Sequence, residues 1–112
     1  MPVNTDPIKQ NRPDLNTGNI TGTLTSATNT ASVPIGGKFT LSISGFGTAS
    51  VNLERSFDGT NWKVVDTFTG NTEKNGEEWA TGLDANGNRT KVLYRLNCTS
   101  YTSGTIAYYL GG

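Results

Sequence analysis

The chain has 112 residues, which is enough for one domain. Its nine basic residues balance nine acidic ones, so net charge does not attract it to nucleic acid or to an anionic membrane. No apolar run approaches the roughly 20 residues of a membrane-spanning helix. We therefore expect neither nucleic acid nor a membrane as a partner.

The polar composition indicates short strands joined by tight turns. Thr, Gly, Asn and Ser fill nearly half of the chain, whereas Leu, Ile, Val and Phe fill about a fifth. Thr favours strands, and Gly and Asn favour the turns between them. The sequence thus predicts a thin core, with stability shared with a partner.

Residues 1–17 show neither a helical nor a strand period. They hold three of the four prolines, each of which favours extended backbone, and they lack the pattern of a secretory signal. We predict an extended N-terminal arm that orders against a neighbouring subunit, with Ile8 and Leu15 as apolar anchors. A disordered terminus is the alternative.

From residue 18 onward, apolar and polar residues alternate with the period of strands. The first strands are expected at 20–24 and 31–35, before a turn at Gly36-Gly37. The next alternating apolar positions are Phe39, Leu41 and Ile43, then Ala49, Val51, Leu53 and Phe57, and after a hairpin signal at Asp58-Gly59, Trp62, Val64 and Phe68.

The second half of the chain continues this pattern. Residues 70–76 are expected to form a polar loop, Trp79 a short strand, and Asn86-Gly87 a tight turn. The last two strands each have one apolar face, formed by Val92, Tyr94, Leu96 and Cys98 and by Ile106, Tyr108 and Leu110. We predict an all-β fold, a single antiparallel β-sandwich over residues 18–112, either Ig-like or jelly-roll-like.

The reactive side chains indicate no catalysis. Histidine, the usual proton carrier near neutral pH, is absent from the sequence. Cys98 is the only cysteine, which suits folding in a reducing cytoplasm. It shares the strand face of Val92, Tyr94 and Leu96, which places it in the core. Glu77 and Glu78 point to opposite faces of a strand and are expected to be solvated, as are Glu54 and Arg55. We expect no enzymatic activity and no cofactor.

Two local motifs predict turns. Residues 84–88, Asp-Ala-Asn-Gly-Asn, superficially resemble a calcium loop, but the Gly is fourth instead of sixth and Arg95 occupies the place of the bidentate Glu. Residues 56–62, Ser-Phe-Asp-Gly-Thr-Asn-Trp, resemble an Asp-box hairpin shortened by one residue, in which the Asp caps the turn and the Trp packs beneath it. We predict structural roles for both motifs and no metal site.

The aromatic residues leave a sugar-binding face open as an alternative. The candidates for such a face are Trp62, Trp79, Tyr94, Tyr101, Tyr108 and Tyr109. Most are expected to fill the thin core. Tyr108 and Tyr109 point to opposite sides of their strand, so we expect one of them to be exposed.

Two stretches carry a resemblance to a known family. They are Ser-Val-Asn-Leu-Glu-Arg-Ser-Phe-Asp-Gly-Thr-Asn-Trp at 50–62 and Val-Leu-Tyr-Arg-Leu-Asn-Cys-Thr-Ser-Tyr-Thr-Ser-Gly-Thr-Ile at 92–106. Together they resemble small β-sandwich structural proteins of tailed bacteriophages, some of which are head decoration or capsid cement proteins. The resemblance covers about residues 44–112 and leaves out the arm.

This resemblance implies a virion protein, made in the host cytoplasm, that binds the outer surface of the major capsid protein as a homotrimer and stabilises the head. We expect its contacts to come from Ile8, Arg12 and Leu15 of the arm and from Phe46 in an exposed loop. The alternatives are a head–tail or tail component, which would form rings, and a carbohydrate-binding module.

Overall fold

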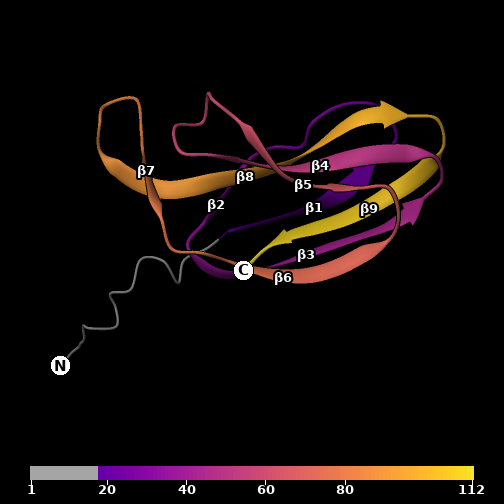
Figure 1. Ribbon diagram of the computed structural model, residues 1–112, viewed down its shortest axis with the longest axis horizontal. Helices are drawn as coiled ribbons and strands as arrows, with labels where there is room; N and C mark the ends of the chain where they lie inside the picture. The colour runs from indigo at the N-terminus through magenta and orange to yellow at the C-terminus, as the bar shows by residue number, and fades with distance from the viewer. Residues whose placement is uncertain (1–17) are drawn as a thin grey trace.

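A computed structural model describes residues 18–112, and all of its regular elements are strands (Figure 1). In chain order they are β1 (Asn19–Leu24), β2 (Val33–Ile35), β3 (Gly37–Phe46), β4 (Ala49–Ser56), β5 (Lys63–Phe68), β6 (Thr72–Glu78), β7 (Thr81–Leu83), β8 (Arg89–Tyr101) and β9 (Gly104–Gly111). In this range no helix is long and apolar enough to cross a membrane.

The strands form two antiparallel sheets that pack face to face (Figure 1). The first sheet has the order β1-β9-β3-β6, and the second has the order β2-β8-β4-β5, with β7 also paired to β8. The length of β8 lets it pair with β7 at Arg89–Lys91, with β2 at Val92–Tyr94 and with β4 along much of its course. The predicted all-β antiparallel sandwich is confirmed.

The core lies between the inner faces of the two sheets. The predicted inner face of β8 is confirmed, because Val92, Tyr94, Leu96 and Cys98 are all buried. Phe39, Leu41 and Ile43 of β3, Val51 and Leu53 of β4, and Ile106 and Leu110 of β9 are buried with them. Each such apolar side chain contributes roughly 1.5–3 kcal/mol when fully removed from water.

The predicted loop at residues 70–76 is wrong, because β6 spans Thr72–Glu78 and pairs with β3. Its inward positions include Lys74 and Gly76, so the strand shows no apolar alternation. The ring of Phe39 occupies the space over Gly76, where a Cβ atom would lie 2.6 Å from the ring. Charged side chains on an edge strand also discourage pairing with other chains.

An ion pair closes one open side of the sandwich. The Lys74 ammonium lies 2.7 Å from the carboxylate of Asp66, and so joins β6 of the first sheet to β5 of the second. On the opposite side, the amide of Gly18 donates to the carbonyl of Pro34, next to the start of β1. Both edges of the sandwich are therefore linked by polar contacts.

The two turn motifs have the predicted structural roles. One carboxylate oxygen of Asp58 accepts the amide hydrogens of Thr60 and Asn61 at 2.8 Å each, and these bonds hold the pKa of Asp58 far below its ordinary value. Trp62 was expected beneath the turn, and its ring stacks on the guanidinium of Arg95 at 4.3 Å. Asp84 likewise caps its own turn, where Gly87 has a φ of 81°.

Candidate functional site

Large apolar side chains gather at one end of the sandwich. Phe57 in the β4–β5 turn, Trp79 in the β6–β7 link and Leu83 in β7 are all exposed, Trp79 to 60%. The backbone brings their segments together, because the amide of Leu83 donates to the carbonyl of Phe57 at 2.9 Å. β7 lies at the left end of the molecule in Figure 1. We define the β7 end as Phe57, Trp79, Leu83, Arg89 and Lys91.

The exposed Trp79 side chain is oriented by a hydrogen bond. Its indole N–H donates to the Glu77 carboxylate at 2.8 Å, and the next amide, that of Ala80, donates to the Glu78 carboxylate at 3.0 Å. The predicted short strand at Trp79 is wrong, because this residue lies in the link between β6 and β7. A hydrogen bond that orients the ring before binding lowers the conformational freedom that the ring loses when a partner binds to it.

A cleft of about 420 Å³ lies beside Trp79. Its lining includes Thr81 of β7 and the basic residues Arg89 and Lys91 of β8. One guanidinium N–H of Arg89 donates to the Thr81 hydroxyl at 3.0 Å. In the part of the chain that the structure describes, neither Arg89 nor Lys91 has a carboxylate partner.

The scaffold behind the β7 end contains a buried carboxylate. Glu78 is only 4% exposed, and it accepts hydrogen bonds from Arg55 at 2.5 and 2.9 Å and from the Tyr94 hydroxyl at 2.8 Å. Burial raises the pKa of Glu78, but these hydrogen bonds, with that from Ala80, lower it below its ordinary value overall. The expected solvated Glu78 is wrong, because pairing with Gly37 of β3 directs it between the sheets.

A second carboxylate is buried on the outer face of the second sheet. Glu54 accepts from the guanidinium of Arg95 at 2.8 Å and from the side-chain amide of Asn97 at 3.0 Å. The prediction of a solvated Glu54 is also wrong. The reason is that Arg95 and the Trp62 ring stacked on it cover this part of the sheet.

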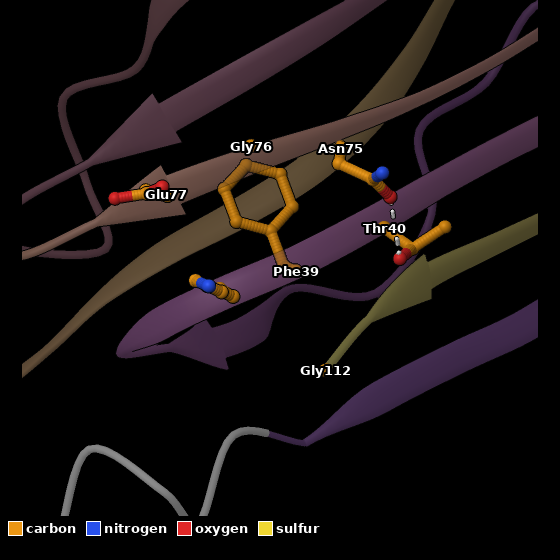
Figure 2. A pocket seen from close by; sticks show the side chains of 7 residues that line it. Phe39, Thr40, Asn75, Gly76, Glu77 and Gly112 are labelled. Carbon is orange, nitrogen blue, oxygen red and sulfur yellow. Dashed lines mark hydrogen bonds between the residues drawn. The ribbon is translucent and has the colours of Figure 1, made fainter.

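A second hollow, of about 500 Å³, lies on the first sheet beside the C-terminus. Figure 2 shows the residues of β3 and β6 that line it, with the Thr40 hydroxyl donating to the Asn75 side chain at 3.0 Å. The ring among its lining residues, Phe39, is buried and packs on Tyr94 at a centroid distance of 5.0 Å. This hollow therefore presents polar groups without an exposed ring, unlike the β7 end.

The aromatic side chains do not form one sugar-binding face. Tyr94 is buried and Trp79 is exposed, while Trp62, Tyr101, Tyr108 and Tyr109 are half-buried. The expectation that Tyr108 or Tyr109 is exposed is wrong. Tyr108 packs against the core, and the Tyr109 hydroxyl donates to the carbonyl of Gly112 at 2.9 Å.

Cys98 has the predicted place in the core. It is 2% exposed, its thiol donates to the carbonyl of Ser100, and burial raises its pKa. A neutral, covered thiol is a poor nucleophile. Within residues 18–112, no group of three or more His, Cys, Asp or Glu side chains is arranged to hold a metal ion.

The predicted contact residues do not come together in a described site. Ile8, Arg12 and Leu15 lie outside the described residues. Phe46 is the last residue of β3 and is half-buried against the core, so its assignment to an exposed loop is wrong. Sequence reasoning missed the β7 end, although Trp79 and Leu83 lie among polar residues outside the alternating runs and offered a signal.

Comparison with protein-family models, with curated proteins and with solved structures finds no match to this chain. The resemblance of residues 50–62 and 92–106 to phage structural proteins therefore stays a prediction. Among the described surfaces, the β7 end is best suited to binding, because it combines exposed apolar side chains with a cleft lined by two cations.

Proposed function

We propose that the protein is a non-enzymatic structural protein of a bacteriophage virion, which binds the outer surface of the major capsid protein and stabilises the head. The virion assignment rests on the resemblance at residues 50–62 and 92–106. The observation that carries the binding role is the β7 end, where the exposed, hydrogen-bonded Trp79 lines the basic cleft and the exposed Leu83 lies two residues after Thr81 of its lining.

The residue types at the β7 end are those of protein interfaces. Trp, Phe and Arg are enriched in interface cores, and Trp and Arg often dominate the binding energy. Clustered apolar side chains mark binding surfaces, whereas single ones are ordinary. Three such anchors on one copy give modest affinity, and a homotrimer that presents three copies would gain avidity.

The scaffold is suited to a mechanical role. Two charged side chains of β6, Glu78 and Lys74, each bond across the two sheets. The potentially reactive groups also have structural partners, because Glu54 and Glu78 are paired with arginines and Cys98 is covered. These contacts support a rigid binding body whose side chains serve the fold and the interface.

The test is co-sedimentation with heads that lack this protein. We expect saturable binding by the wild type, and binding at least roughly tenfold weaker by Trp79→Ala/Leu83→Ser, as for interface anchors. Val64→Ser is the matched control, because Val64 is equally exposed but lies on β5. A wild-type protein that stays in the supernatant at every concentration would refute the proposal.

Solution mass separates this proposal from the tail alternative. Light scattering should give a trimer or a monomer that assembles on the head, whereas a head–tail or tail component should give a larger ring. A carbohydrate-binding module is the second candidate, favoured by the exposed indole of Trp79 beside the polar cleft. Its sign would be saturable quenching of tryptophan fluorescence by host surface polysaccharide.

A further inference from the structure

We infer that the cleft beside Trp79 receives an acidic, extended segment of the partner protein. In this arrangement its carboxylates bind Arg89 and Lys91, and a neighbouring apolar side chain packs on the indole of Trp79. This inference rests on the proposed function, because it names the chemistry by which the β7 end would bind the capsid surface.

The two cations of the cleft are available for an anionic partner. Three other basic side chains, Arg55, Lys74 and Arg95, are neutralised by carboxylates. Arg89 is instead oriented by the Thr81 hydroxyl, and only one of its five N–H donors is used in this bond. Charge-assisted bonds from a guanidinium to a carboxylate are among the strongest hydrogen bonds in proteins.

The spacing of the cations favours an extended peptide. Thr81 is opposite Lys91 and Leu83 is opposite Arg89, so these four side chains lie on one face of the β7–β8 pair. Residues two apart on a strand are separated by roughly 7 Å. Carboxylates two apart on an extended segment have the same separation, which lets both reach a cation at once.

The surroundings favour a peptide over nucleic acid. The carboxylate of Glu77 accepts from the indole of Trp79, which lines the cleft, and the lining residue Glu78 is paired with Arg55. Two cations beside the Glu77 carboxylate match two separate carboxylates better than a dense row of phosphates, and the chain as a whole has no net positive charge. An acidic segment with an apolar residue instead satisfies the two cations and covers the exposed ring.

The first test uses short peptides as probes of the free protein. In ¹H–¹⁵N NMR titrations, acetyl-Asp-Ser-Asp-Ser-Leu-amide, whose two Asp and Leu side chains lie on one face when it is extended, should shift the Trp79 indole and the amides of Thr81–Leu83 and Arg89–Lys91. The neutral acetyl-Asn-Ser-Asn-Ser-Leu-amide and the Arg89→Gln/Lys91→Gln variant should each weaken these shifts roughly tenfold or more. Equal shifts with both peptides would overturn the inference. Stronger shifts with a duplex DNA oligonucleotide would replace it with nucleic-acid binding.

The second test separates this inference from the proposed function. Head binding by Arg89→Gln/Lys91→Gln should fall roughly tenfold, while the control Lys38→Gln on the first sheet should bind like the wild type. If the charge variant binds normally while Trp79→Ala/Leu83→Ser does not, the acidic-segment inference fails and the proposed function stands. If the wild type does not bind heads, the proposed function fails, and the peptide titration alone decides whether the cleft binds acidic segments.

Discussion

The guanidinium of Arg55 on β4 donates two hydrogen bonds, at 2.5 and 2.9 Å, to the carboxylate of Glu78 on β6 in the opposite sheet. The same guanidinium stacks on the ring of Phe57 at 4.6 Å, and Glu78 directly precedes Trp79. This pair therefore joins the two sheets and positions two of the three apolar anchors of the β7 end. The stability of the fold and the geometry of its binding surface depend on the same contact.

Breaking this pair should destabilise the protein. Arg55→Met leaves Glu78 buried without its cation, and removal of one partner of a buried pair costs about 3–5 kcal/mol. Because Arg55 is 32% exposed, we expect about 3 kcal/mol, measured by urea unfolding. The control Glu73→Gln, on the solvent side of β6, should change stability by less than about 0.5 kcal/mol. A change that small in Arg55→Met would contradict this role.

The pair also predicts how stability depends on pH. The pKa of Glu78 is lower in the folded protein than its ordinary value of 4.5. The stability that ionised Glu78 contributes to the fold is therefore fully present above pH 4.5, and it is lost as pH falls through the lower pKa of the folded protein. Unfolding midpoints measured from about pH 7 to pH 3 should fall more steeply for the wild type than for Glu78→Gln. Parallel curves would exclude Glu78 as a source of the acid sensitivity.

Gly76 should not tolerate a side chain. An added Cβ would lie 2.6 Å from the Phe39 ring, so Gly76→Ala should cost about 1–3 kcal/mol through overpacking. Gly70→Ala is the matched control, since nothing lies within 4 Å of a Cβ there. Phe39→Leu should reduce the cost of Gly76→Ala in a double-mutant cycle. Additive effects in that cycle would show that the two residues do not interact.

Cys98 should be unreactive until the protein unfolds. Its burial and raised pKa leave little accessible thiolate at neutral pH. Mass spectrometry after iodoacetamide treatment should therefore show no adduct in buffer and one adduct in concentrated urea. Rapid labelling in buffer, with circular dichroism unchanged, would place the thiol at the surface instead.

Local periodicity predicted the fold wherever apolar residues face the core. The inner face of β8 follows directly from Val92, Tyr94, Leu96 and Cys98, because residues at every second position of a strand lie on the same face. It failed at Thr72–Glu78, where inward positions carry Lys74 and Gly76. The space over Gly76 is filled instead by the ring of Phe39 on the neighbouring strand β3. A pattern within residues 72–78 cannot reveal this contact.

The candidate site was harder to predict because it depends on contacts between distant segments. Alternation correctly placed Glu77 and Glu78 on opposite faces, but only the pairing of β6 with β3 decides which one is buried. The sequence predicts a short strand at Trp79, a residue type that favours strands. Its exposed position depends on the β6–β7 link, on the bond from its indole to Glu77 and on the bond from the Ala80 amide to Glu78.

The most direct test of binding through the β7 end is amide hydrogen exchange of the protein, free and bound to heads. We predict slower exchange on binding in Trp79–Leu83 and Arg89–Lys91, with β1 and β9 on the opposite sheet unchanged. Protection confined to β1 and β9, with no change at the β7 end, would show that the protein binds through another surface and would contradict the proposed role of Trp79 and Leu83.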